Sequence, residues 1–306
     1  MAGQVMNGFS GAVLVARHGH VILNCGYGSV HGVPMQRDTL FRISSIGKQF
    51  VSAAVVRLQR EGKIDLDEPL GRLLPKVPQD KASITMRQIL SHTSGLPQGY
   101  IGEQSTDAES AIRAILQIPL QAPPGTKFIY ANDNYQLAAA IVERISKRGL
   151  ARFEEEQLFR PLGLRGISSY GAERGIAPTN EPLPPRLATS QWGTSGHVAT
   201  AQDLYRWYRA LAAGNVVGMA GYRELTTGVV KIGEGEAGLG WFMGRTAKRT
   251  RTIFTRGNDD FGPNSLIYDY PTRNITIVIL THAGNKDPET SWSRAILADI
   301  EGQFGL

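Results

Sequence analysis

The 306-residue sequence contains a single cysteine, Cys25. With one cysteine, no disulfide can form within the chain and no cluster of cysteine ligands can hold a metal ion. We expect Cys25 to be a small buried apolar side chain. The six histidines are dispersed and no H-E-x-x-H occurs. The sequence therefore predicts no metal site, and it indicates no cofactor.

Long apolar runs and concentrated charge are also missing. No apolar segment approaches the length that spans a bilayer, so we expect no membrane span. The 33 basic residues, which contribute to a net charge of +6, are scattered apart from residues 248–251. Because no aromatic and basic side chains are interleaved, the sequence predicts no nucleic-acid partner.

The first seven residues lack a basic segment followed by an apolar one. A secretory signal has that order of segments. The sequence therefore predicts a cytoplasmic protein if the chain is full length, and a periplasmic or secreted one if a signal segment was trimmed.

The chain does contain β-rich ends and a helical middle. A hairpin is expected at residues 10–16 and 21–27, and later strands at 239–244, 252–255, 265–270 and 274–281. Helices are expected at 45–60, 107–116, 132–147, 151–159, 204–211 and 287–304, with Thr200 capping the fifth. Residues 177–187 are proline-rich and predict an ordered loop. Residues 233–238 match G-x-G-x-x-G but do not join a strand to a helix, so a flexible loop is expected there.

Strands at both ends with helices between them predict an α+β fold. One antiparallel sheet with flanking helices would be built from residues 1–62 and 197–306. Residues 63–196 would form a mainly helical inserted domain.

Ser45 and Lys48 stand three residues apart at the start of the predicted helix 45–60. On a helix this spacing puts both side chains on one face, one turn apart. A serine hydroxyl becomes a good nucleophile only when another group takes its proton, and a lysine one turn away can serve in that transfer. This S-x-x-K arrangement needs no histidine base. An S-x-x-K pair often occurs by chance, so other motifs in the sequence must show whether this pair is catalytic.

The companion motif is Tyr130-Ala131-Asn132, just before the predicted helix 132–147. A tyrosine beside an ammonium group can shuttle a proton, and an asparagine can hold a lysine and donate to a substrate carbonyl. Asn132 also stands where a helix N-cap belongs. The residues alone leave both interpretations of Asn132 open, a helix cap and a residue of a catalytic site.

Six segments occur together in one order, at residues 39–48, 61–69, 90–97, 130–132, 161–164 and 238–241. In residue identity and order they resemble motifs of the serine β-lactamase-like superfamily. The resemblance is to the subgroup of class C β-lactamases, D-alanyl-D-alanine carboxypeptidases and family VIII carboxylesterases. The resemblance covers roughly residues 10 to 285, and its joint specificity is high. It implies the β-lactamase/transpeptidase-like fold, which has the same arrangement of a sheet with an insertion.

The resemblance also implies roles for these residues. Ser45 would be the acylated nucleophile, and Lys48 and Tyr130 would share the general-base and general-acid work. Asn132 would orient them and bind substrate. The backbone N–H of Ser45 would form half of an oxyanion hole, which stabilises the charge on the attacked carbonyl oxygen.

The chain departs from the family at the third motif. The family has Lys-Thr-Gly, His-x-Gly or Trp-x-Gly on the strand that faces the serine, whereas this strand carries Thr255-Arg256-Gly257-Asn258. The resemblance implies substrate contacts for Thr255, Gly257 and Asn258, with the backbone N–H of Asn258 as the second half of the oxyanion hole. Arg256 is one position late, and it should point away from the side of Thr255 because strand residues alternate. The missing lysine argues against a substrate carboxylate and leaves a neutral ester possible.

We therefore expect a serine hydrolase that works through an acyl-enzyme, most simply a carboxylesterase for short-chain esters. A β-lactamase or D-alanyl peptidase is the alternative enzyme. The alternative of another class is a weakly active or inactive relative that binds peptidoglycan or a protein. The expected partner is a small ester or amide substrate, and the sequence leaves the oligomeric state open.

Overall fold

The computed structural model describes residues 8–102, 105, 107–169, 192–258, 264–282 and 291–306. Its main element is an eight-stranded sheet in the order β2-β1-β13-β12-β11-β10-β9-β8. The two ends of the chain meet in this sheet, because β1 (Gly11–Arg17) pairs antiparallel with β13 (Ile275–Thr281). The other strands of this sheet are β2 (His20–Tyr27), β8 (Val230–Ile232), β9 (Gly235–Ala237), β10 (Phe242–Arg245), β11 (Arg251–Asn258) and β12 (Asn264–Tyr270).

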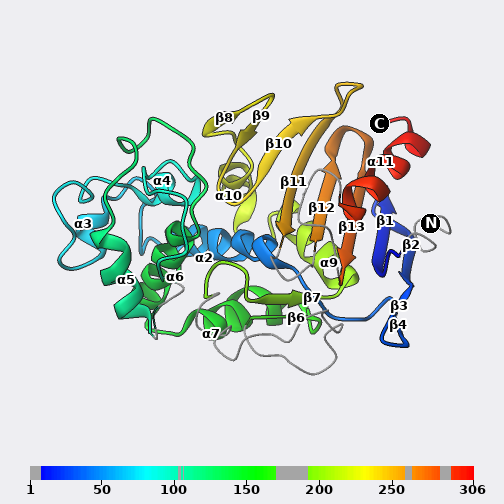
Figure 1. The fold of residues 1–306 in the computed structure, drawn as a ribbon, viewed down its shortest axis with the longest axis horizontal. Coiled ribbons are helices and arrows are strands. Elements are labelled where there is room, and N and C mark those ends of the chain that lie inside the picture. The colour runs from blue at the N-terminus through cyan, green and yellow to red at the C-terminus, as the bar shows by residue number, and fades with distance from the viewer. Residues whose placement is uncertain (1–7, 103–104, 106, 170–191, 259–263, 283–290) are drawn as a thin grey trace.

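The predicted α+β fold, with a large antiparallel sheet and flanking helices, is confirmed (Figure 1). The helices of the insertion gather on one side of the molecule, away from β1 and β13. The domain boundaries at residues 62 and 197 stay a prediction. Two small sheets join β3 (Ser29–Val30) to β4 (Val33–Pro34), and β5 (Phe41–Arg42) to β7 (His197–Ala199) and β6 (Ile167–Ser169).

The centre of the large sheet is buried on both faces. Leu14 and its partner Val278 point into the core that includes α9 (Ala201–Ala212). Val13 and its partner Ile279 point to the opposite face, where α11 (Trp292–Phe304) packs. Since side chains alternate along a strand, a helix on each face explains why both strands are apolar throughout.

The edge strand β2 has a different environment, and Cys25 on it is exposed rather than buried. The prediction of a buried Cys25 was wrong because it rested on the general tendency of free cysteines to be buried, and that tendency does not fix the position of one residue in a fold. An edge strand has a neighbour on one side only, and β2 has no fully buried residue.

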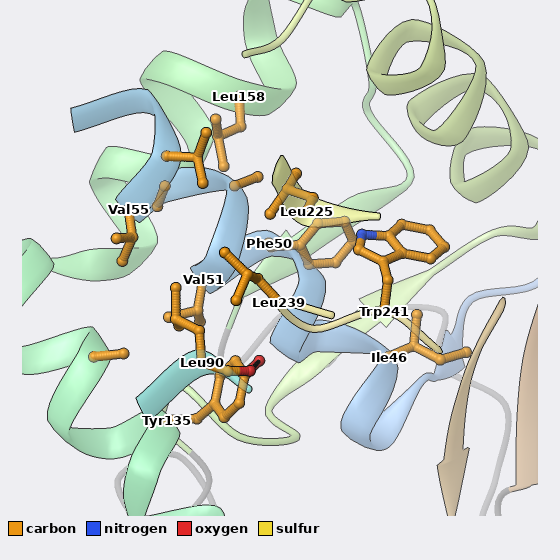
Figure 2. Packing of buried hydrophobic residues seen from close by; sticks show 14 of the residues in the cluster. Ile46, Phe50, Val51, Val55, Leu90, Tyr135, Leu158, Leu225, Leu239 and Trp241 are labelled. Atoms are coloured by element: carbon orange, nitrogen blue, oxygen red, sulfur yellow. Dashed lines mark hydrogen bonds between the residues drawn. The ribbon is translucent and has the colours of Figure 1, made fainter. Parts of the chain in front are cut away.

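Helix α2 (Lys48–Arg60) is the central helix of the molecule, and it continues from the 3₁₀ turn Ser44–Gly47. It packs against α6, α7 and α10. Figure 2 shows Phe50, Val51 and Val55 of this helix among apolar side chains from several other segments. A helix that is apolar on most sides belongs in a core. The first turn of α2 therefore has a rigid support.

The other helices largely follow the predicted positions. Thr200 accepts a hydrogen bond from the backbone of Asp203 at 3.1 Å and caps α9 as expected. The predicted loop 177–187 and the start of the predicted helix 287–304 lie outside the described residues. The remaining helices are α3 (Leu70–Leu73), α4 (Met86–Leu90), α5 (Ala108–Gln117), α6 (Asn132–Ser146), α7 (Leu150–Glu154) and α10 (Gly218–Leu225).

Strand β9 and the turn that joins it to β8 replace the flexible loop expected at residues 233–238. β9 pairs with β10 and with β8, which extends the sheet beyond β11. The segment is rich in glycine and glutamate, which are depleted in strands, so neighbouring strands decide its conformation. Among the described helices, none has the length and apolar character required to cross a bilayer.

Candidate active site

Ser45 lies in a tight turn between β5 and α2. The backbone N–H of Ile46 donates to the carbonyl of Ile43 at 3.1 Å and closes this turn. Ser44 is fully buried and has a φ of 48°, an uncommon value for a residue other than glycine. Such backbone strain persists only where the surrounding structure imposes it, and it often marks functional sites. Ser45 is thus presented, half-buried, at the start of a rigid helix.

Two of the predicted side chains converge on one atom, the hydroxyl oxygen of Ser45. Lys48 Nζ donates to this oxygen at 2.8 Å, and the Tyr130 hydroxyl donates to it at 2.9 Å. Lys48 is only 3% exposed, and its Nζ lies 5.2 Å from the centre of the Tyr130 ring. The serine hydroxyl therefore has two hydrogen-bond partners beside it, and one of them, Lys48, is buried.

Asn132 is the first residue of α6, whose N-cap is Ala131. The interpretation of Asn132 as a helix cap is therefore wrong. Its side chain is buried, and among the described residues its Oδ1 has no hydrogen-bond partner. The second partner of Lys48 is instead the carbonyl of Thr194, at 3.2 Å. A buried amide oxygen without a partner is costly to the protein, and it offers an acceptor to a bound molecule.

His92 also lies at this site, and the sequence did not predict its position there. Its ring stacks on that of Tyr130, with 4.3 Å between centroids and 28° between planes. Its Nδ1 accepts a hydrogen bond from the backbone N–H of Ala131 at 3.2 Å. Burial, and then the positive charge of Lys48, lowers the pKa of His92 to about 3. The ring is therefore neutral at ordinary pH, and it holds Tyr130 in place.

A second histidine, His197, packs against the turn that carries Ser45. It is fully buried, and its Nε2 lies 2.9 Å from a carboxylate oxygen of the equally buried Glu154. A Cβ at Gly47 would come within 2.2 Å of the His197 ring, so this position requires glycine. The backbone N–H of Ile43 donates to the His197 carbonyl at 3.1 Å. No local pattern could have shown this role, because Glu154 and His197 are 43 residues apart.

The strand β11 approaches the turn of Ser45 from the other side. A Cβ on Gly257 would lie 2.1 Å from the carbonyl oxygen of Ile43 and 3.0 Å from the backbone nitrogen of Ser45. Glycine allows this close approach of two backbones. Thr255 is 2% exposed and lines the same cavity as Ser45. Asn258 ends the strand, is exposed, and accepts a hydrogen bond from Asn264 at 2.6 Å.

One edge of β11 is open next to the serine. The pairing between β10 and β11 ends at Phe242 and Phe254, so β10 does not pair with residues 255–258. Arg256 lies on the face of Phe254, with its guanidinium carbon 5.4 Å from the centre of that ring. This is the face away from Thr255, as the alternation of strand residues predicts.

The cavity at Ser45 is small, about 30 Å³, and it is also lined by Lys48, Tyr130, Trp241 and Thr255. Such a volume holds little more than the reacting group of a substrate. In the part of the chain that the structure describes, no group of three His, Cys, Asp or Glu residues could hold a metal ion.

Several known proteins resemble this chain in sequence, in fold or in both. Penicillin-binding protein 4* of Bacillus subtilis is 25% identical over 96% of this chain and 72% of its own length. The putative penicillin-binding protein PbpX of the same organism is 25% identical over 72% of this chain, which spans 59% of that protein. The octameric penicillin-binding protein homologue from Pyrococcus abyssi has a TM-score of 0.86 at 19% identity, over 99% of this chain and 75% of the other.

Two solved hydrolases have the same fold. EstCE1, described as a hydrolase with promiscuous acyltransferase activity, has a TM-score of 0.79 at 23% identity, over 92% of this chain and 93% of its own. The D-amino acid amidase from Ochrobactrum anthropi SV3 has a TM-score of 0.83 at 20% identity, over 98% and 97%. The family model described as Beta-lactamase matches residues 3–299. With nearly the whole chain matched, the protein belongs to this family of β-lactamase-like serine hydrolases.

Proposed function

We propose that the protein is a carboxylesterase that hydrolyses short-chain esters through an acyl-enzyme on Ser45. One observation carries the proposal: the Ser45 hydroxyl oxygen lies within hydrogen-bond distance of both Lys48 Nζ and the Tyr130 hydroxyl. This is the arrangement that nucleophilic catalysis requires, a nucleophile in contact with the groups that move its proton.

The proposed reaction has two halves. With one member of the pair of Lys48 and Tyr130 deprotonated, Ser45 Oγ attacks the carbonyl carbon and its proton passes to that member. The carbonyl oxygen becomes negative, and the backbone N–H groups of Ser45 and Asn258 stabilise it, each such donor being typically worth about 2.7–4 kcal/mol of barrier. The bond to the alcohol oxygen breaks, and Tyr130 delivers the proton to that oxygen. Water then attacks the acyl group, gives a proton to the same pair, and releases the carboxylic acid as Ser45 regains its hydrogen.

The strand side of the site supports a neutral ester. Thr255 stands where the family usually has a basic or aromatic residue, and it is buried against the cavity of Ser45. Arg256, the next residue, lies over Phe254 and also lines this cavity, one position away from the cation of the family motif. A substrate carboxylate would therefore lack the cation that the family places at the position of Thr255. The solved structure of the hydrolase EstCE1, which has the same fold, is consistent with this proposal.

A second candidate is an amidase that acts on D-amino acid amides or β-lactams. Asn132 favours it, because its buried Oδ1 has no partner among the described residues and could accept an amide N–H of the substrate. Penicillin-binding proteins and a D-amino acid amidase are among the similar proteins.

A substrate panel with mass spectrometry tests these proposals. The protein is incubated with p-nitrophenyl butyrate, nitrocefin and a D-alanyl peptide, and the mass of the peptide that contains Ser45 is measured. We expect a butyryl adduct and turnover of the ester, both lost in Ser45→Ala. Ester turnover that persists in Ser45→Ala would exclude the mechanism. An adduct with nitrocefin or the peptide alone would favour the amidase, and no adduct with any substrate would favour a binding protein.

A further inference from the structure

A row of aromatic rings crosses strands β10, β11 and β12 beside the site of Ser45. Phe242 on β10, Phe254 on β11 and Tyr268 on β12 stand directly opposite one another in the strand register. The Phe254 and Tyr268 rings stack at 4.5 Å and 13°, and the Phe242 and Phe254 rings at 5.7 Å and 27°. Cross-strand aromatic pairs of this kind stabilise a sheet. Here they also form a continuous apolar floor.

The aromatic row is covered at one end only. α11 packs on β12 and β13, and Tyr268 is 5% exposed. Phe254 and Phe242, farther along the row, are only partly buried. Figure 1 shows α11 on the β13 side of the sheet, away from β10. The uncovered part of the row is therefore available to a bound molecule.

A cavity of about 730 Å³ lies over this floor, and we call it the aromatic groove. Phe128 and Tyr130, from the segment before α6, form part of its wall. It shares Tyr130, Phe242 and Arg256 with the small cavity at Ser45, so the two spaces adjoin. Ligand sites of drug-sized molecules are typically about 300–1,000 Å³. Since the cavity at Ser45 holds little beyond the reacting group, the rest of a substrate needs an adjoining space of this kind.

The position of Tyr130 indicates which part of the substrate enters the groove. In the proposed reaction, Tyr130 gives its proton to the departing oxygen, so the alcohol must lie beside Tyr130 when the bond breaks. Tyr130 is also one of the three residues that line both cavities. The alcohol part of the ester, rather than the acyl part, would therefore extend into the aromatic groove.

The charges of the groove indicate the chemistry of that alcohol. Its wall contains three arginines and three glutamates, which are Arg245, Arg256, Arg294, Glu234, Glu236 and Glu301. These charges balance, so the groove as a whole favours neither an anion nor a cation. Its floor is aromatic, and aromatic side chains favour stacked or edge-on contacts with other rings.

We propose that the aromatic groove binds the leaving alcohol of the substrate, and that it selects neutral alcohols with an aromatic or extended apolar body. This inference rests on the proposed esterase function and adds the substrate class of its leaving group. Phe254 and Phe242 are then specificity-determining residues. They contact the alcohol part of the substrate, which leaves before deacylation.

Acetate esters of ethanol, butan-1-ol and 3-phenylpropan-1-ol test the proposal, because their leaving groups are similarly basic but differ in apolar length. All three form the same acetyl-enzyme, so the groove should affect kcat/KM and leave the deacylation rate constant unchanged. For the wild-type protein, we expect kcat/KM to rise by about tenfold or more from the ethyl to the phenylpropyl ester, as burial of several apolar groups allows. Phe254→Ala and Phe242→Ala should each reduce this ratio. Tyr27→Ala, which removes a partly buried ring from the opposite edge strand, should retain it.

A second measurement separates the groove from the chemistry. Calorimetric titration of Ser45→Ala with 3-phenylpropan-1-ol should show binding that is lost when Phe254→Ala is added. Acetylation of Ser45 with no dependence on the alcohol, together with no binding of phenylpropanol, would overturn the groove proposal and leave the esterase intact. A dependence on acyl length instead, in a series of ethyl esters, would also overturn it. Binding of phenylpropanol without any acylation would refute the esterase and retain the groove as a site for apolar alcohols.

Discussion

The two sides of the cleft at Ser45 are built differently. On the helix side, Lys48 and Tyr130 contact the serine through their side chains, and α2 behind them is embedded in the main core. On the strand side, β11 comes close through its backbone at Gly257, while the side chains of Thr255 and Arg256 depart from the family motif. Side-chain identity is therefore kept where protons would move and changed where a substrate would be recognised. The comparison suggests that the chemistry and the specificity of this site can be altered separately.

The largest effect is expected on the helix side, from Lys48→Ala. Removal of a general acid or base typically costs about 10²–10⁴-fold in rate. We expect a loss of that size in the rate of Ser45 acylation, measured by stopped-flow kinetics with p-nitrophenyl butyrate. Lys63→Ala is the matched control, since Lys63 is exposed and its ion pair within the described residues is with the neighbouring Glu61. A near-normal kcat/KM in Lys48→Ala, with folding verified by circular dichroism, would refute the proposed role of this lysine.

The next largest effect is expected on the strand side, from Gly257→Ala. The new methyl group would lie 2.1 Å from the Ile43 carbonyl oxygen, so β11 must move away from the turn of Ser45. A displaced backbone N–H at Asn258 would weaken the oxyanion hole, and loss of one such donor typically lowers kcat by about 10²–10³-fold. Gly302→Ala on α11 is the control, because nothing lies within 4 Å of its new methyl group. Full activity of Gly257→Ala would mean that the approach of β11 does not contribute to catalysis.

The sequence predicts the parts of the site that are local or patterned. The spacing of Ser45 and Lys48 places them on one helical turn, and the resemblance supplies Tyr130. Contacts between distant segments were not predictable, since no period or spacing records them. Lys48 reaches the carbonyl of Thr194, which is 146 residues away. The stack of His92 on Tyr130 is another such contact, formed only when two loops meet in the fold.

The same distinction applies to the fold. Apolar runs bounded by turns predicted the central strands, because both faces of β1 and β13 are buried by helices. They did not predict β8 and β9, and the glycine and glutamate of β9 take a strand conformation only through pairing with β8 and β10. Cys25 was misplaced because the pattern of a hairpin does not show which of its strands lies at the edge of the sheet.

An intermediate effect, on stability and its pH dependence, is expected from His92 on the helix side. Its pKa is about 3 in the folded protein, against an ordinary value of 6.5. Between these values the unfolded chain binds a proton that the folded protein does not bind, so the free energy of unfolding falls as the pH decreases from 6.5 toward 3. One such group contributes a slope of at most about 1.4 kcal/mol per pH unit.

His92→Asn should remove that slope, because asparagine does not titrate and tolerates the φ of 58° at this position. Urea unfolding of both proteins at pH 7, 6, 5 and 4 measures the difference. The wild-type protein should lose more stability than the variant over this range. Parallel curves for the two proteins would show that His92 titrates normally, and that it is not held neutral against Tyr130.

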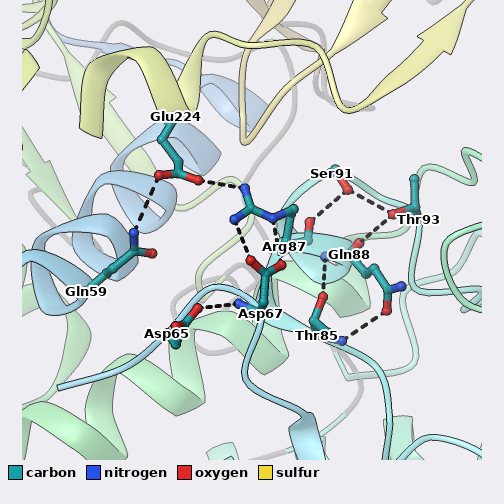
Figure 3. Close-up of polar contacts among 9 residues, drawn as sticks. All are labelled: Gln59, Asp65, Asp67, Thr85, Arg87, Gln88, Ser91, Thr93 and Glu224. Atoms are coloured by element: carbon teal, nitrogen blue, oxygen red, sulfur yellow. Dashed lines mark hydrogen bonds and ion pairs between the residues drawn. The ribbon is translucent and has the colours of Figure 1, made fainter. Parts of the chain in front are cut away.

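The smallest effect is expected from a polar network at the far end of the helix side. Arg87 on α4 forms a bidentate pair with Asp67, at 2.8 and 2.9 Å, and a second pair with Glu224 on α10 at 2.7 Å (Figure 3). These side chains are partly solvated, with 30% of Arg87 and 63% of Asp67 exposed. Exposed ion pairs of this kind typically contribute about 0.2–1 kcal/mol.

Arg87→Met, which retains an apolar stem, tests whether this network holds the helix side in place. We expect a loss of about 1 kcal/mol in the free energy of unfolding, and a double-mutant cycle with Asp67→Asn should assign part of it to the pair. The rate of Ser45 acylation should not change, because buried apolar contacts support the first turns of α2, whereas this network contacts the helix through Gln59 near its end. A fall in acylation comparable with that of Gly257→Ala would show that the polar network, rather than the core, positions Lys48. The difference between the two sides of the cleft would then depend on polar contacts, and not on the burial of α2 in the core.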